Sequence, residues 1–212
     1  MNEQIKDLLM NRDYTALVQS SDLKKMCKEL ITFLYGEDLF IYRGSEALGL
    51  VCKEQGIYDG EHVKNILRRL FWHLNDESGA YCRGAPVAIG EIGRNSPHFE
   101  GFKNMTVSLL DNEEVELKFV VYALGRAAQG VKDAYPDPVE KLLPLLDHEE
   151  PTIRGYAAWS LGELGAEDAR GNLENLLQDD NVIRVYYRGE FKDMAVKDVA
   201  QESLNKMSRG EA

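Results

Sequence analysis

Apolar residues recur along this chain in pairs of short segments with the spacing of amphipathic helices. The clearest pair lies between residues 138 and 165, where the leucine-rich segment PVEKLLPLL leads through an acidic turn to TIRGYAAWSLGEL. In both segments apolar side chains repeat three and four positions apart, which predicts two helices that each bury one face. Pro151 stands where it can open the second helix, and Gly165 stands where it can end it.

The second segment of each pair carries an apolar residue followed by glycine. These glycines, Gly49, Gly90, Gly125 and Gly162, are 41, 35 and 37 residues apart, and a fifth, weaker copy runs from 172 to 207. A period of this length is typical of helical repeat proteins. Because one helical hairpin cannot bury its apolar face alone, the pattern predicts an all-α fold, an α-solenoid of about five stacked helical hairpins.

The repeats define the expected organisation of the chain. We expect a single repeat domain over 1–212, with an N-terminal helical cap at 1–26 and the repeats at 27–207. In the last repeat, apolar and polar residues alternate on both sides of Arg188-Gly189, which predicts a small β-hairpin inserted at 181–198. That hairpin is either a structural cap of the stack or a contact for a partner, including a homodimer formed through its edge strand.

The fourth copy is the most informative for comparison with known repeats. It combines an acidic turn, Pro151, the basic Arg154, the small pair at 157–158 and the Leu-Gly pair at 161–162. This order resembles HEAT repeats, in particular the phycobilisome-lyase (PBS lyase) type of HEAT-like repeat, and the resemblance covers roughly 27–207. Taken whole, the chain resembles a small prokaryotic HEAT-repeat family with no established activity. The resemblance implies a HEAT/armadillo-like superhelix whose second helices line a concave groove.

One face of those second helices carries candidate binding residues. In the fourth copy Tyr156, Trp159 and Glu163 are spaced i, i+3, i+7 and therefore share one helical face, and the third copy carries aromatic residues and an arginine in matching places. Aromatic and arginine side chains dominate binding hot spots, so the groove is a candidate partner site. The alternative is that these aromatic residues pack between helices inside the stack. The candidate groove residues are Arg83, Glu91, Phe119, Tyr122, Arg126, Tyr156, Trp159 and Glu163, with Arg83 and Arg126 expected to position carboxylate groups of the partner.

The spacing of reactive residue types does not predict a catalytic centre. The four histidines form no repeated ligand set, and no two of the three cysteines lie within four residues of each other, as a zinc signature requires. We therefore expect buried, reduced cysteines, no metal, no cofactor and no catalytic residues. The polar turn at 75–79 contains two carboxylates and a serine, and it is either a plain helix connection or a ligand contact.

Charge narrows the choice of partner. The net charge is −11, and residues 110–180 alone contain 16 acidic and 6 basic side chains. Without a basic face the chain is not expected to bind nucleic acid or an anionic membrane. The polar N-terminus and the few cysteines favour the cytoplasm.

The leading functional hypothesis follows from these exclusions. It is a non-catalytic scaffold or adaptor that binds a partner protein in its concave groove. The alternative, implied by the resemblance to bilin lyases, is an accessory or lyase-like protein that holds a pigment or cofactor for transfer to a target protein.

Overall fold

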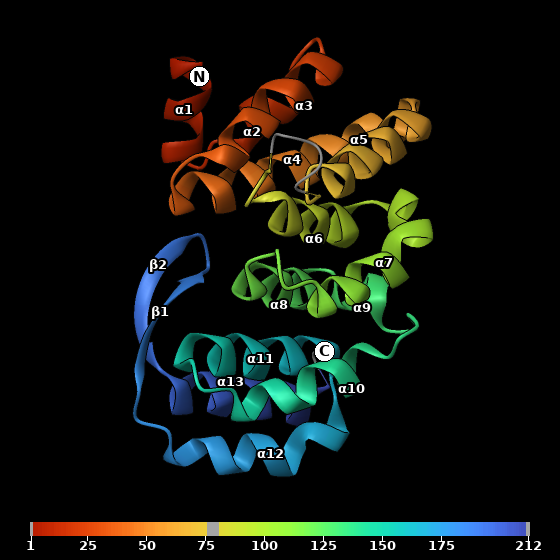
Figure 1. Cartoon of the computed structure of the whole chain (residues 1–212). Helices are drawn as coiled ribbons and strands as arrows, with labels where there is room; N and C mark the ends of the chain where they lie inside the picture. Colours follow the sequence, from red (N-terminus) through yellow and green to blue (C-terminus); the bar gives the residue numbers. More distant parts are fainter. Residues whose placement is uncertain (1, 76–80, 211–212) are drawn as a thin grey trace.

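The computed structural model describes residues 2–75 and 81–210, and these form a stack of five helix pairs (Figure 1). The predicted all-α solenoid is confirmed. The first helices of the pairs form an outer layer: α3 (Leu23–Thr32), α5 (Gly60–Trp72), α7 (Lys103–Ser108), α10 (Pro138–Leu142) and α12 (Arg170–Asn175). The second helices form an inner layer: α4 (Asp38–Tyr58), α6 (Ala85–Asn95), α8 (Leu117–Arg126), α11 (Pro151–Leu164) and α13 (Val196–Arg209).

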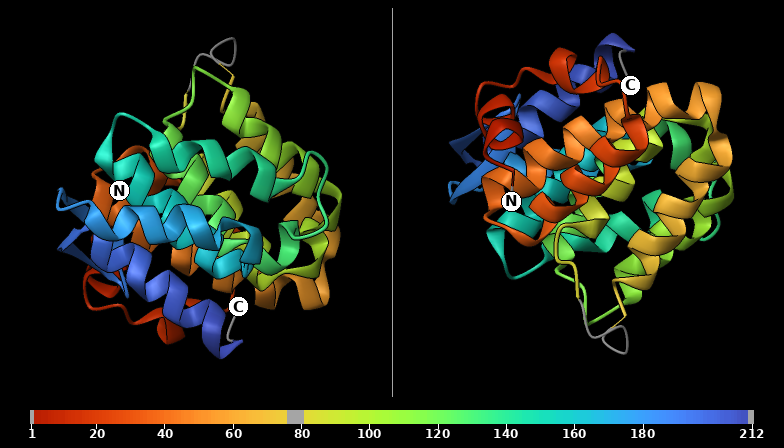
Figure 2. Two further views of the ribbon diagram at one scale, coloured as in Figure 1. Left: turned by 90° about the horizontal axis from the view of Figure 1, so that it is seen from below. Right: turned by 90° about the horizontal axis from the view of Figure 1, so that it is seen from above.

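Shorter elements complete the stack. Several outer helices are extended by 3-10 turns. The short helices and turns are α1 (Glu3–Met10), α2 (Tyr14–Val18), η1 (Phe33–Tyr35), η3 (Pro97–Phe102), η4 (Leu109–Asp111), α9 (Ala128–Val131), η5 (Leu143–Asp147), η6 (Glu167–Ala169) and η7 (Leu176–Gln178). Buried apolar side chains from α1 to α13 form one contiguous core cluster. Figure 2 shows the same stack of helices from below and from above. No helix within the described ranges is long and apolar enough to cross a lipid bilayer.

The recurring glycines let neighbouring inner helices touch. A Cβ atom on Gly90 of α6 would lie 2.6 Å from the backbone of Ala123 in α8, and one on Gly162 of α11 would lie 2.6 Å from Ser203 in α13. Helix α11 opens at Pro151 and ends at Gly165 in the left-handed conformation (φ 64°), as the sequence predicts. The pattern therefore specifies both the ends of this helix and its contact face.

The fifth repeat carries the predicted β-hairpin between η7 and α13. Strands β1 (Val182–Tyr187) and β2 (Glu190–Ala195) pair antiparallel. The connecting residues Arg188 and Gly189 both have positive φ (52° and 91°), as a type I′ turn requires. The hairpin does not extend the end of the stack. It runs back along the stack to the first repeat, so that its tip lies close to α1 and α4 (Figure 1).

The glycine contacts give a stability prediction. Gly90→Ala should lower the free energy of unfolding by about 1–3 kcal/mol, because backbone atoms of α8 cannot yield to the new methyl group. The matched control is Gly171→Ala in α12, where a Cβ would meet nothing within 4 Å. That substitution should be neutral or stabilise the fold by up to about 1 kcal/mol. Urea denaturation of the two variants measures both values, and equal stabilities would contradict the packing role of Gly90.

Candidate functional site

The β-hairpin lies across the aromatic residues of the inner helices. The ring of Tyr186 stacks on Tyr42 of α4 with centroids 4.4 Å apart, and Phe191 meets the same ring edge-on at 5.6 Å. The backbone N–H of Tyr186 donates to the hydroxyl of Tyr156 at 3.0 Å. The predicted aromatic strip therefore exists, but its occupant in this structure is the chain's own hairpin.

A buried carboxylate anchors the hairpin to the first repeat. Glu46 of α4 is 8% exposed and accepts hydrogen bonds from the hydroxyls of Tyr14 and Tyr186, the latter at 3.0 Å. Burial raises the pKa of both tyrosines above the ordinary value, and the nearby Glu46 carboxylate raises it further. Both phenols consequently remain protonated and available as donors to Glu46.

Arg43 completes this anchor from the same helix, α4. Its Nε and Nη2 atoms each donate to the carbonyl of Gly189 at 3.2 Å, at the tip of the hairpin. Its Nη1 atom donates to the carbonyls of Leu9 (3.3 Å) and Met10 (2.7 Å), at the C-terminal end of α1. A cation at that end of a helix is favoured by the helix dipole. One buried guanidinium thus holds the N-terminal cap and the hairpin tip on the same helix.

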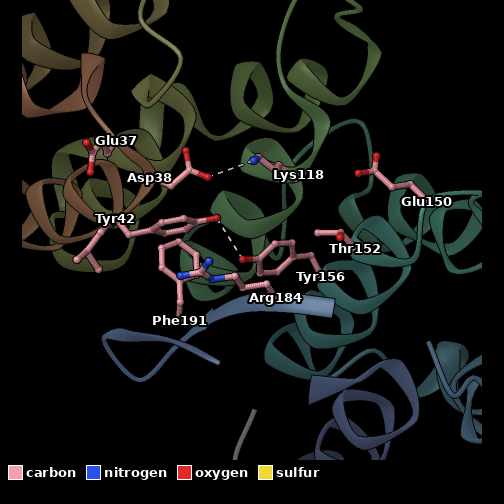
Figure 3. A pocket seen from close by; sticks show the side chains of 10 residues that line it. Glu37, Asp38, Tyr42, Lys118, Glu150, Thr152, Tyr156, Arg184 and Phe191 are labelled. Carbon is pink, nitrogen blue, oxygen red and sulfur yellow. Dashed lines mark hydrogen bonds and ion pairs between the residues drawn. The ribbon is translucent and has the colours of Figure 1, made fainter. Parts of the chain in front are cut away.

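Two clefts remain open beside the hairpin. The first lies at the N-terminal ends of α4, α8 and α11 and is here called the amino-end cleft (Figure 3). Its volume is about 540 Å³. Lys118 and Asp38 form an ion pair at 3.3 Å on one side, and Arg184 lies 5.0 Å from the ring of Phe191 on the other. The lining residues are Glu37, Asp38, Leu39, Tyr42, Lys118, Glu150, Thr152, Tyr156, Arg184 and Phe191.

A second opening, the carboxyl-end cleft, lies at the C-terminal ends of α6, α8 and α11. It has a volume of about 330 Å³, and Trp159 forms part of its wall, stacked on Tyr122 at 5.1 Å. Lys206 of α13 pairs with Glu163 at 2.6 Å on its rim. The lining residues are Glu46, Arg94, Tyr122, Arg126, Trp159, Glu163, Tyr186, Tyr187, Arg188, Glu202, Ser203 and Lys206.

A buried ion pair fixes the arginine of this second cleft. Arg126 donates to both carboxylate oxygens of Glu91, at 2.5 and 3.1 Å, and Glu91 is only 1% exposed. Burial raises the pKa of Glu91, and the adjacent Arg126 limits that rise. The bidentate geometry holds the guanidinium in one orientation.

The eight predicted groove residues therefore divide into two groups. Phe119, Tyr122, Tyr156 and Glu91 are buried beneath the hairpin or between helices, in keeping with the packing alternative. Four remain at least partly accessible: Arg126, Trp159 and Glu163 in the lining of the carboxyl-end cleft, and Arg83 outside the lining of either cleft.

Arg83 does not line the amino-end cleft, but it bonds Asp38, which does. It bonds Glu116 at 2.7 and 3.1 Å and Asp38 at 2.7 Å, and its guanidinium lies 5.2 Å from the ring of Phe119. These contacts bridge the second and third repeats to the first. Arg83 therefore links three repeats through its ion pairs, in addition to being a candidate ligand contact.

Three residues of the site escape an alignment based on the sequence repeats. The alignment on the Leu-Gly pairs predicts Arg43 as the counterpart of Tyr156 in the first repeat. In the structure Tyr42 lies beside Tyr156 instead, and the two tyrosine hydroxyls are 3.2 Å apart. Tyr186 is predicted only as part of a strand, and Lys206 lies in the weakest repeat. The available signal for Tyr186 is its place in an aromatic pair next to the turn.

Among residues 2–75 and 81–210, the histidines, cysteines and carboxylates form no cluster of three or more side chains that could hold a metal ion. Cys27, Cys52 and Cys82 are buried free thiols. The polar turn at 75–79, considered above as a ligand contact, lies outside the described residues apart from Asn75.

Comparison with known proteins supports the same architecture. A family model described as HEAT repeats matches residues 106–187. An uncharacterized protein of Archaeoglobus fulgidus is 45% identical over 177 residues, which cover 82% of this chain and 93% of that protein. These matches do not confirm the phycobilisome-lyase subtype.

Solved structures agree at the level of the fold. An engineered protein superposes with a TM-score of 0.53 at 17% identity, covering 99% of this chain and 98% of that one. A designed armadillo repeat protein in complex with the peptide (KR)4 has a TM-score of 0.51 at 18% identity, covering 92% and 98%. At such identities the likeness concerns the fold alone.

The Arg43 contacts predict how the hairpin is held. Arg43→Met should lower the free energy of unfolding by about 2–3 kcal/mol, because it leaves buried carbonyls of α1 and the hairpin tip without donors. The control is Arg170→Met in α12, which removes an exposed ion pair with Glu167 and should cost less than about 1 kcal/mol. Urea denaturation gives the energies, and amide hydrogen exchange across β1 and β2 should accelerate in Arg43→Met alone. Unchanged exchange there would refute the anchoring role.

Proposed function

This chain belongs to the HEAT-repeat proteins, in one family with the Archaeoglobus protein, and we propose that it is a non-catalytic scaffold or adaptor that binds a segment of a partner protein. The observation that carries the proposal is the pair of clefts on either side of the hairpin. Together they expose charged and aromatic side chains from α4, α8, α11 and α13 along one face of the stack. The designed armadillo protein solved with a bound peptide is a precedent for this use of the fold.

The charges of the two clefts favour a partner segment of defined direction. The amino-end cleft is lined by three carboxylates and two cations, and the carboxyl-end cleft by four cations and three carboxylates. A segment that lies along the hairpin with its basic residues near Glu150 and its acidic residues near Lys206 meets complementary charge at both ends. Charge complementarity of this kind fixes orientation and excludes wrong partners.

The hairpin itself serves the stack in this proposal and does not form a homodimer. The N–H of Tyr186 points away from β2, so the outward-facing groups of β2 belong to Phe191, Asp193 and Ala195. Two-fold pairing of β2 with a second copy would place Asp193 opposite Asp193, or Lys192 opposite Lys192, in its longest registers. Like charges directly opposite each other destabilise strand pairs.

The location proposed for the protein is the cytoplasm. Its three cysteines are free and buried, and Cys27 and Cys52 are hydrogen-bonding neighbours. Two thiols that lie so close together persist in the reduced state in a reducing compartment.

Affinity capture tests the groove. A tagged protein carrying Glu150→Lys with Lys206→Glu keeps its net charge but inverts both ends of the groove. We expect at least about a tenfold loss of the partner retained from a native lysate, measured by quantitative mass spectrometry against the unmodified chain. The matched control is Lys132→Glu with Glu174→Lys, two exposed positions that line neither cleft, and it should retain the partner.

Two outcomes would contradict the proposal. Equal recovery of the partner by the inverted variant would remove the clefts as the binding site. A visible absorbance band in protein purified from its own source would instead support the alternative, an accessory protein that holds a pigment or cofactor.

A further inference from the structure

A second surface, on the side of the stack away from the hairpin, exposes large apolar side chains. Trp72 at the end of α5 is 59% exposed, and Met105 in α7 is 50% exposed. Between α5 and the η3–α7 segment runs a groove of about 900 Å³, here called the outer groove. Figure 1 shows α5 and α7 on the opposite side of the stack from β1 and β2. The outer groove is therefore separate from both clefts of the inner face.

One wall of the outer groove follows α-helical spacing. It consists of Lys64, Arg68 and Trp72, which recur every fourth position of α5, so they span about 12 Å, or roughly two helical turns. The other wall is formed by the 3-10 segment η3 and by α7, which contribute Pro97, Gly101 and Met105.

The floor of the outer groove is apolar and its middle is open. The rings of Phe71 and Phe102 stack there with centroids 6.0 Å apart and planes 14° from parallel. A Cβ added to Gly101, on the wall beside this floor, would meet nothing within 4 Å, so the space next to Gly101 is open. The groove thus has the shape of a trough with room for an inserted apolar side chain.

The charge of the outer groove differs from that of the chain as a whole. Helix α5 carries Lys64, Arg68 and Arg69 against a single acidic residue, Glu61, in a chain of net charge −11. The bonds of Lys64 and Arg68 to Glu61 lie at the exposed surface, where ion pairs contribute little and exchange readily. On the opposite wall Glu100 pairs with Lys103 at 2.5 Å, and Lys103 also pairs with Asp133 at 2.8 Å. The α5 wall of the groove therefore offers two cations to a ligand, and the single carboxylate of the lining lies on the other wall.

We propose that the outer groove docks an acidic amphipathic helix of a partner protein. A helix of two or more turns fits the length of the walls, and its apolar face would cover Trp72, Met105 and the Phe71–Phe102 floor. Carboxylates on the flank of that helix would pair with Lys64 and Arg68. A strand is a poorer occupant, because both walls are helical and present no free backbone edge to extend.

A displayed peptide library tests the proposal even while the partner is unidentified. The probe is a phage library of peptides of roughly 16 residues, randomised on an amphipathic helical template and selected on the full chain. We expect the enriched peptides to combine an apolar stripe with net negative charge. Their affinity should fall at least about tenfold on Trp72→Ser with Met105→Ser, and again on Lys64→Glu with Arg68→Glu.

The control removes equally exposed apolar side chains elsewhere. Ile57→Ser with Tyr58→Ser, at the end of α4, should bind the selected peptides like the unmodified chain. The proposal is overturned if no binder sensitive to the Trp72 and Met105 changes is enriched, if the enriched peptides are basic, or if the Lys64 and Arg68 changes have no effect. It is also overturned if light scattering shows a dimer that these changes dissolve, since the occupant would then be a second copy. None of these results depends on the inner clefts, so failure here leaves the proposed adaptor function intact.

Discussion

The contact of the hairpin with α4 determines the form of the whole molecule. In a simple solenoid each repeat touches only its neighbours, so the first and last repeats do not interact directly. Here Tyr186 bonds Glu46, 140 positions earlier in the chain, and Gly189 bonds Arg43, 146 positions earlier. These contacts join the two ends of the stack across its inner face. A structural change in the first repeat can consequently act on the fifth repeat directly, without being transmitted through the repeats between them.

The same contact decides which part of the inner face remains available. The aromatic side chains that could anchor a partner are already paired with Tyr186 and Phe191, and burying them again would require the hairpin to leave. What remains is a divided groove whose two openings are lined largely by charged groups. The binding proposed for these openings would depend on charge placement and on the fixed orientation of Arg126, more than on a large apolar area. Such interfaces gain specificity and orientation from electrostatics.

The local features of the fold were predictable, and the long-range ones were not. Pro151, Gly165 and the Leu-Gly pairs specify helix ends and close contacts between neighbouring helices, because each acts over one turn or one repeat distance. The alignment selected Arg43 where the structure has Tyr42, because Tyr42 lies six residues before the leucine of its Leu-Gly pair, whereas Tyr156 lies five residues before its own.

The position of the hairpin required information that no single repeat contains. Alternation and a type I′ turn predict two paired strands, but they do not specify where an inserted hairpin packs. Its site is defined by Glu46, Arg43 and Tyr42 in a repeat far away in the sequence. The residue types of the candidate site and the helix faces that carry them were therefore predictable from the sequence. The β-hairpin that covers the buried residues of the site was not predictable in its position.

The distribution of charge follows from the architecture and leaves one region distinct. Glu37, Glu116 and Glu150 precede α4, α8 and α11, where negative charge is favoured by the positive ends of the helix dipoles. Part of the acidity of the chain is thus a property of one edge of the stack, where parallel inner helices begin. Helix α5 belongs to the outer layer and is basic over its second half, beside an exposed tryptophan. A stack that only needed solubility would gain nothing from that combination, whereas a helix-binding groove needs both its apolar floor and its cations.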